Sequence, residues 1–505
     1  MKSLAAALLV IIAVPAFGEQ ASVDFGSTIR PLSHAGSGVL HSISATTPND
    51  SLLAPIKPST FRGPSAGPGY DRSIALGADY QLVMADFYSG AGTMPGDNDD
   101  WTAWEATCRA VAAQVLAQGN EIQIDIWNEP DQPSFWPRSQ AQYLETWKRG
   151  VNAIREVNPN ATIVGPSTSV YWWHTNLNVE QVLTYAKAND VLPDIISWHS
   201  WDRNLTNEID QVRQFAAAND IDASRISINE YLWWFDQYRS GPVVHFLDAI
   251  EKKNVESGIK SCWNTCSDNS LDGLVDAGGQ PRSNWWLYER YGRMTGSSVM
   301  TVSGGDTLDV VASQDDGVAY ALVGRYKDSY VAFRDSWTVV NHPDVVTPGE
   351  VLLQNLDDVP LLVFGDKVHV LAELIKNSDS AASSGPVVMI DADFTTINGQ
   401  LTLSLPNFGT FDAYFLTITA VAGMPGDFNH DGAVDAADYV VLRDKGGSSF
   451  AADYAIWRSN FGAVYATGTG TADASVVPEA GTVALLAIAL ATCASSTRRL
   501  RPLQL

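Results

Sequence analysis

Cysteine and basic residues are scarce in this 505-residue chain. Four cysteines do not make a disulfide framework, although Cys262 and Cys266 are near enough in sequence to pair locally, whereas Cys108 has no evident partner. Lysine and arginine number 32 against 57 acidic residues, so the formal net charge is -25. This charge argues against nucleic acid as a partner, because little is present to neutralise phosphates. The 45% of hydrophobic residues can bury a large core.

Long hydrophobic runs are also missing. The first run, residues 4–14, follows Lys2, is too short to span a bilayer, and precedes a small-residue site that ends at Gly18. This pattern predicts a secretory signal over residues 1–18 and a mature chain that begins near Glu19. We therefore expect an exported protein, located at the cell surface, in the outer envelope or outside the cell.

The C-terminus has the reverse arrangement. A low-complexity linker at 465–476 precedes Val-Pro-Glu-Ala at 477–480, an apolar run at 482–493 and a basic end. Residues 477–505 resemble a PEP-CTERM sorting tail, which implies export followed by processing. The alternative is a permanent membrane anchor, but the run is shorter than the roughly 20 residues that a spanning helix needs. Contact with a membrane is expected through this segment alone.

Between Val39 and Tyr291, short β-branched runs alternate with helical periodicity, and the predicted barrel domain is residues 19–293. Helices are clearest at 101–117, 143–157, 179–188 and 242–253. The candidate strands are 39–44, the segment reaching 61–62, 81–87, 122–128, 162–166, 195–199, 226–230 and 259–263. Eight such units predict an α/β fold, a (β/α)8 TIM barrel with its site at the carboxyl ends of the strands.

Two further units follow the barrel. Helical periodicity ends at about residue 294, and short apolar runs then alternate with Gly, Asp and Asn turns, which predicts a β-sandwich over 294–422 closed by a strand at 411–419. Residues 425–464 contain an internal repeat, because Ala-Asp-Tyr-Val-Val-Leu-Arg at 437–443 is echoed at 452–458. Two related helices are expected there.

A calcium loop is predicted ahead of the first of these helices. Its oxygen ligands follow the spacing of a hard-cation loop, with Gly432 at the sharp turn. The expected ligands are Asp427, Asn429, Asp431, Ala433, Asp435 and Asp438. An ordinary acidic turn is the alternative. The unit resembles a dockerin, which implies a protein partner, and since the second repeat lacks the loop we expect one structural calcium ion.

Two glutamates end predicted barrel strands, and each follows an asparagine. Glu129 stands in Trp-Asn-Glu-Pro at 127–130, and Glu230 stands in Asn-Glu-Tyr at 229–231. Cleavage of a glycosidic bond needs one protonated and one ionised carboxyl group facing one cavity. Glu129 fits the general acid/base and Glu230 the nucleophile, which Arg62 at the end of the second strand can keep ionised.

The barrel resembles the retaining glycoside hydrolases of clan A, and most of all family 39, which contains β-xylosidases and α-L-iduronidases. The resemblance covers about residues 35–420 and rests on Phe-Arg-Gly at 61–63, Trp-Asn-Glu-Pro at 127–130, Gly-Pro at 165–166, Ser-Trp-His-Ser-Trp at 197–201 and Asn-Glu-Tyr at 229–231. It implies that Glu129 is the acid/base, Glu230 the nucleophile and Asn128 the partner of the sugar 2-hydroxyl.

Other residues at predicted strand ends are candidates for binding sugar. His199 is expected to be a ligand because of its position at the rim. Aromatic rings there either stack on sugar faces or pack in the core, and the sequence leaves both open. The predicted substrate-binding residues are Arg62, Asn128, His199, Trp201, Tyr231 and Trp263. Since the barrel contains no His/Cys metal spacing, no cofactor is expected for catalysis.

The sequence thus predicts a secreted, retaining glycoside hydrolase that cleaves polysaccharides or oligosaccharides by double displacement. The competing hypothesis is a noncatalytic glycan-binding or scaffold protein of the cell surface. Loss of either glutamate would favour this alternative, and both are present. Endo and exo action both remain open.

Overall fold

The computed structural model describes residues 19–464 except 42, 64–67, 91, 120–121, 172–176, 264–269, 306, 328–329, 334–335, 340–341, 361, 363–366, 422–425, 430–432 and 446–449. The chain divides into two compact units, Met1–Ala422 and Gly423–Leu505. The predicted signal, linker and sorting tail lie outside the described residues. Within those residues, no helix combines the length and the apolar character needed to cross a membrane.

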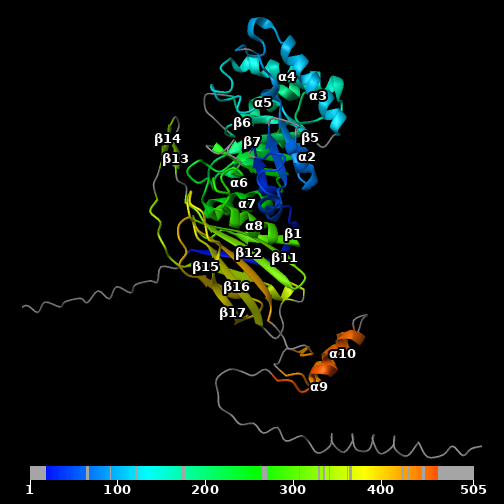
Figure 1. The fold of residues 1–505 in the computed structure, drawn as a ribbon, viewed down its shortest axis with the longest axis vertical. Coiled ribbons are helices and arrows are strands. Elements are labelled where there is room, and N and C mark those ends of the chain that lie inside the picture. Colours follow the sequence, from blue (N-terminus) through cyan, green and yellow to red (C-terminus); the bar gives the residue numbers. More distant parts are fainter. Residues whose placement is uncertain are drawn as a thin grey trace, which may run out of the picture. The chain divides into compact units, whose positions relative to one another are not determined.

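Eight parallel strands close a barrel in chain order, as predicted. They are β2 (Gly38–Leu40), β3 (Thr60–Gly63), β4 (Asp79–Val83), β5 (Ile122–Asp125), β6 (Thr162–Thr168), β7 (Ile195–Ser200), β8 (Ile226–Tyr231) and β9 (Ser257–Lys260). Figure 1 labels β5, β6 and β7 of this barrel. Pairing of β2 with β9 completes the ring. All carboxyl ends of the strands therefore meet at one rim.

A helix follows each barrel strand. The helices are α1 (Asp50–Leu53), α2 (Pro68–Ala75), α3 (Thr102–Gln118), α4 (Gln140–Val157), α5 (Val179–Ala188), α6 (Leu205–Ala218), α7 (Ser240–Lys252) and α8 (Ser283–Arg293). Local sequence sets where they begin: Asn178 and Gln181 form a reciprocal capping box at α5, and the Ser139 hydroxyl accepts from the Gln142 amide at α4. The four helices that the sequence predicted most clearly, α3, α4, α5 and α7, are all present.

Polar residues fill the barrel interior because side chains alternate along each strand. In β5, Ile122 and Ile124 pack outward against the helices, whereas Gln123 and Asp125 point inward. The Gln81 amide donates to the Gln123 carbonyl oxygen at 3.0 Å and to the Ser227 hydroxyl at 3.1 Å. This polar layer lies beneath the rim residues, so the functional side chains stand on a hydrogen-bonded base.

The second sheet is continuous rather than two separate sheets. Its strand order is β17-β16-β19-β12-β11-β10-β1-β15-β18. These strands are β1 (Gln20–Pro31), β10 (Ser297–Val302), β11 (Leu308–Asp315), β12 (Val318–Arg325), β15 (Gly349–Gln354), β16 (Lys367–Ile375), β17 (Val387–Thr395), β18 (Leu401–Leu405) and β19 (Ala413–Ala420). Apolar residues from both ends of this order, such as Val351 and Val370, share one core, so the sheet bends around it. The predicted sandwich is thus a single curved sheet. β13 (Tyr330–Phe333) and β14 (Ser336–Val339) form a separate hairpin.

Assigning all of residues 19–293 to the barrel was wrong at its N-terminal end. β1 pairs with β10 and β15 in the second sheet. Ala21, Val23 and Phe25 alternate toward the core of that sheet and are fully buried. The barrel therefore begins after Pro31, because burial of this alternating face decides where the segment goes.

The barrel and the second sheet share a hydrophobic core. Val311, Leu322 and Phe415 face the barrel and belong to the barrel's cluster. Ion pairs join the two parts at Arg203 and Asp309, 2.6 Å apart, and at Arg290 and Glu373, 2.8 Å apart. The sheet is thereby a fixed support for the barrel.

The second unit contains the two predicted helices, α9 (Ala436–Lys445) and α10 (Phe450–Asn460). The rings of Tyr439 and Trp457 lie 5.2 Å apart, and the Trp457 indole donates to the Asp435 carbonyl oxygen at 2.7 Å. The predicted ligands Asp427 and Asp438 are buried, whereas Asp431 lies outside the described residues. The repeat is thus confirmed as a helix pair.

Candidate active site

A cavity of about 510 Å³ opens at the rim of the barrel. Its polar lining includes His41, Arg62, Asp86, Asn128, Glu129, Ser134 and Glu230. A smaller cavity of about 190 Å³ shares Glu129, Ser134 and Trp263 with it. A separate cavity of about 700 Å³ lies at the second sheet and has no Trp, Tyr or Phe among its described lining residues. Of the two cavities at the rim, the one of about 510 Å³ is called the larger cavity below. The rim cavity of about 510 Å³ brings both predicted catalytic glutamates together.

Glu129 reaches the cavity through an unusual turn after β5. Its φ is 47°, in the left-handed region that costs a non-glycine residue of order 1–3 kcal/mol, and its amide donates to the Ser167 carbonyl oxygen at 2.9 Å. The side chain points to His199, whose Nδ1 lies 2.9 Å from Glu129 Oε1. The turn thus directs this carboxyl group into the barrel mouth.

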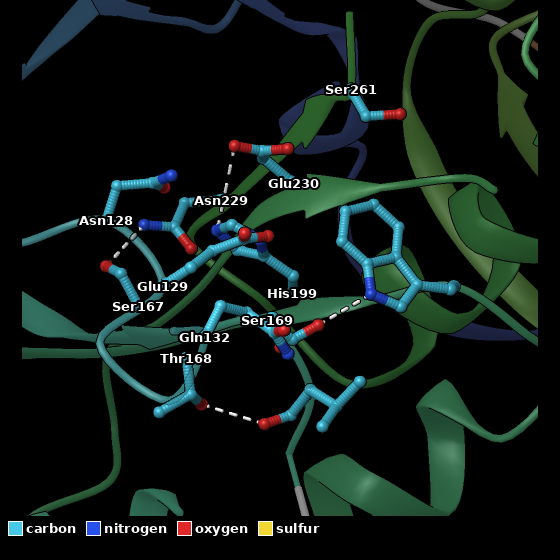
Figure 2. A network of polar contacts seen from close by, with 12 residues as sticks. Asn128, Glu129, Gln132, Ser167, Thr168, Ser169, His199, Asn229, Glu230 and Ser261 are labelled. Carbon is cyan, nitrogen blue, oxygen red and sulfur yellow. Dashed lines mark hydrogen bonds and ion pairs between the residues drawn. The ribbon is translucent and has the colours of Figure 1, made fainter. Parts of the chain in front are cut away.

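Glu230 reaches the cavity through a β-bulge. Ile228 of β8 pairs with Trp198 of β7, yet the next pair is Glu230 with His199, so Asn229 is an extra residue. Both Asn229 and Glu230 then face inward: the Asn229 amide donates to Asp125 Oδ2 at 3.1 Å, and Glu230 lines the cavity. Figure 2 shows Glu129, His199 and Glu230 converging.

Arg62 connects the rim residues. Its guanidinium donates from Nη1 to Glu230 Oε1 at 3.0 Å, from Nη2 to Asn128 Oδ1 at 2.8 Å, and from Nε and Nη2 to Asp125 Oδ2 at 3.0 and 2.7 Å. The arginine is buried, so it is held by these partners rather than by water. The predicted contact between Arg62 and Glu230 is confirmed. Asn128 accepts from Arg62 through its oxygen, which leaves its amide hydrogens for a ligand.

The two carboxyl groups differ in their surroundings. Burial raises the pKa of Glu129 to about 7, against the opposing charge of Arg62. Burial also raises the pKa of Glu230, but Arg62 donates to this carboxylate directly and so favours its charged form. Burial lowers the pKa of His199 to about 4, so the imidazole between them is neutral at pH 7. Direct contact with the guanidinium distinguishes Glu230 from Glu129.

His41 and Asp86, two ionisable residues of the cavity, were not predicted from the sequence. His41 follows β2 and has a φ of 52°, and Asp86 lies in the 3-10 helix Met84–Phe87 after β4. Burial and the charge of Arg62 lower the pKa of His41 to about 4. Arg62 was predicted because it lies at the carboxyl end of a strand. His41 and Asp86 also follow strand ends, so the same criterion applied to every strand would have predicted them.

Aromatic residues at the rim divide between lining and core. The cavity of about 190 Å³ is lined by Trp201, Trp233 and Trp263. Trp263 also lines the cavity of about 510 Å³. The indoles of Trp201 and Trp263 are fixed by donation to the carbonyl oxygens of Ser169 at 2.6 Å and Leu232 at 2.9 Å. Trp201 and Trp263 therefore lie at the rim site, and their predicted contact with substrate stays a prediction.

Tyr231 was wrongly predicted to bind substrate. Its side chain is fully buried outside the cavity, where its hydroxyl donates to the Gly36 carbonyl oxygen at 2.6 Å and contacts the Tyr288 hydroxyl. The bulge at Asn229 places Glu230 on the inner face, so the next residue points outward to stack on Phe246. Tyr231 therefore supports the barrel wall.

Glu129, His199 and Glu230 also form the only group among the described residues with three potential metal ligands within 4.8 Å of one another. The guanidinium of Arg62 lies 3.0 Å from Glu230 Oε1, so a divalent cation at this point would meet a positive charge. The geometry favours acid–base chemistry of the two carboxyl groups.

Comparison with known proteins relates this chain to glycosidases. The model of the family "Glycosyl hydrolases family 39" matches residues 86–230, a span that contains both glutamates. The barrel is glycoside hydrolase family 39-like. A 3-O-alpha-D-galactosyl-alpha-L-arabinofuranosidase of Bifidobacterium longum subsp. longum is 25% identical over 393 residues, 70% of this chain and 32% of that protein. The chain therefore spans about a third of the length of this curated relative.

Solved structures share the fold of this chain. The structure of N2152 from Neocallimastix frontalis superposes with a TM-score of 0.68 at 23% identity, over 80% of this chain and all of that one. A monomeric beta-xylosidase from Caulobacter crescentus CB15 has a TM-score of 0.58 at 14% identity, with coverage of 80% and 100%. At such identities the likeness concerns the fold alone.

Proposed function

We propose that this protein is a retaining glycoside hydrolase that cleaves O-glycosidic bonds in polysaccharides or oligosaccharides. One observation carries the proposal: a carboxylate oxygen of Glu129 and one of Glu230 lie within 4.8 Å of each other in the rim cavity. Retaining enzymes separate the two carboxyl groups by about 5–5.5 Å, whereas inverting enzymes need about 6.5–9.5 Å to admit a water molecule. The short separation supports double displacement.

The residues divide the reaction between them. Glu129 protonates the glycosidic oxygen while Glu230 attacks the anomeric carbon, so the bond to the leaving group breaks and a glycosyl ester forms on Glu230. Glu129 then takes a proton from water, whose oxygen attacks the anomeric carbon and releases Glu230. Arg62 holds the nucleophile ionised, and Asn128 offers its amide to a sugar hydroxyl.

His199 positions the acid. When Glu129 is protonated, its hydroxyl donates to Nδ1 of the neutral imidazole, and Nε2 then carries the hydrogen toward Glu230 Oε1 at 3.8 Å. This arrangement favours a proton on Glu129 and a negative charge on Glu230, which is the distribution that the first step requires.

The activity test is product release from xylan, uronic-acid-containing and algal polysaccharides and aryl glycosides, with residues 19–464 and Ca²⁺. We expect cleavage, and the product sizes will distinguish endo from exo action. Retention of one glycan without cleavage of any substrate would instead support the noncatalytic binding protein.

The sugar in the larger cavity is expected to be neutral rather than a uronate. Arg62 is the positively charged side chain among the described lining residues, and it already forms ion pairs with Asp125 and Glu230. His41 also lines the cavity but is uncharged at pH 7. Asp86 adds a carboxylate. The residues between 32 and 293 that are not described include no lysine or arginine. A substrate carboxylate would therefore lack a partner.

The test compares 4-nitrophenyl xylosides, arabinosides, galactosides and glucosides with the corresponding glucuronides and iduronides. We expect kcat/KM to favour a neutral sugar by about 100-fold or more, because an unpaired charge in this site is costly. Efficient release from a uronide would contradict the assignment.

We also propose one structural calcium ion in the second unit. Both oxygens of Asp438 accept backbone amides of the loop, from Asn429 at 2.8 Å and Asp435 at 2.7 Å, and Asp427 is buried beside the same helix pair. These oxygen donors suit a hard cation that would hold the loop against the helices. Asn429, Asp431, the Ala433 carbonyl and Asp435 would complete the ligands.

Calorimetric titration of residues 19–464 with Ca²⁺ tests this site. We expect one ion per chain, abolished by Asp427→Ala and retained by Asp453→Ala, which alters the repeat that lacks the loop. Binding that survives Asp427→Ala would contradict the predicted ligands. With a signal at 1–18 and a sorting tail at 477–505, we further propose that the protein is exported and that the dockerin-like unit binds a protein partner.

A further inference from the structure

We infer that the smaller cavity is a leaving-group subsite for one neutral sugar ring. The inference rests on the proposed hydrolase function and adds to it the recognition of the departing half of the substrate. Glu129 lines both cavities, whereas Glu230 lines the larger one alone. The nucleophile must lie against the sugar that it attacks, and the acid must reach the oxygen between the two halves. The larger cavity therefore holds the attacked sugar, and the smaller one holds the leaving group.

The lining of the smaller cavity suits a sugar ring. Three indoles surround it: the ring centroids of Trp233 and Trp263 lie 5.1 Å apart, and those of Trp201 and Trp263 lie 4.9 Å apart. The apolar face of a sugar ring packs well on such surfaces. Glu129 is the one ionisable residue among its described lining residues, so the geometry selects an uncharged ligand.

Polar groups at the floor supply the hydroxyl contacts. The Gln132 amide nitrogen donates to the Ser169 hydroxyl at 2.6 Å, and that hydroxyl donates to the buried carboxylate of Asp131 at 2.5 Å. Figure 2 shows Gln132 and Ser169 beneath Glu129. Because this chain fixes the orientation of Gln132, its side-chain oxygen is held ready to accept from a sugar hydroxyl.

Trp233→Ala tests the subsite, because Trp233 lines the smaller cavity and not the larger one. Trp234→Ala is the matched control: this neighbouring tryptophan is 40% exposed and lines neither cavity. The substrates are disaccharides of xylose, arabinose, galactose and glucose, each compared with the glycosyl fluoride of the same sugar. Fluoride leaves without filling a sugar subsite.

For a sugar that the wild type cleaves, we expect Trp233→Ala to lower kcat/KM on the disaccharide about tenfold more than on the fluoride. Trp234→Ala should leave the ratio unchanged. Equal losses on both substrates, or none on the disaccharide, would overturn the subsite while leaving the hydrolase intact. If the wild type cleaves neither fluorides nor disaccharides, the proposed function fails and the subsite with it.

Discussion

Glu230→Ala is expected to lower turnover by about four orders of magnitude or more while the protein stays folded. In the proposed mechanism this carboxylate forms the covalent bond to the sugar. Among the described carboxylates that line the cavity, Glu230 is the one that accepts a hydrogen bond from Arg62. The fold should survive because Arg62 keeps its bonds to Asp125 and Asn128. Activity on the best aryl glycoside, together with circular dichroism and thermal unfolding, measures both effects.

Sodium azide provides the control for this variant. Alanine leaves space beside the anomeric carbon, so azide should restore turnover and give a glycosyl azide of inverted configuration. A folded Glu230→Ala protein that retains more than about a tenth of the wild-type rate would contradict the nucleophile assignment.

Glu129→Gln is expected to slow substrates with sugar leaving groups by about 10²–10⁴-fold, because these must be protonated to depart. Activated aryl glycosides with good leaving groups should lose far less in the bond-breaking step. The measurement is kcat/KM over a series of aryl glycosides whose phenols differ in pKa, beside a disaccharide. Equal losses on every substrate would show that Glu129 is not the acid.

The same variant changes the pH profile. Burial raises the pKa of Glu129 to about 7, so the acid is protonated below this pH and loses its proton as the pH rises through it. Wild-type kcat/KM should therefore fall above pH 7, and this limb should be missing in Glu129→Gln. A limb that persists in the variant would belong to another group.

Much of this architecture was predictable from local patterns. Eight strands appear where alternating or β-branched runs were found, and Glu129, Glu230 and Arg62 converge because residues at the carboxyl ends of parallel strands share one rim. Such positions follow from the barrel itself. Knowing the strand ends was enough to place Glu129 and Glu230 at one rim.

Non-local pairing and strand irregularities were not predictable in this way. β1 joins β10 and β15, which lie more than 250 residues along the chain, and nothing within its own sequence identifies those partners. The extra residue Asn229 in β8 reverses the direction of Tyr231, and strict alternation has no means of locating a bulge. Arg62 hydrogen-bonds to Asp125 inside the barrel, which the sequence shows as a charged residue in an apolar run.

The proposed mechanism is tested most directly by trapping the covalent intermediate in which the sugar is attached to the enzyme. Incubation with 2-deoxy-2-fluoro glycosyl fluorides of the cleaved sugar slows the second step more than the first, and mass spectrometry of peptides then locates the label. We expect one glycosyl group per chain, attached to Glu230. A label on Glu129, or a hydrolysis product of inverted configuration with no labelled peptide, would contradict double displacement through Glu230.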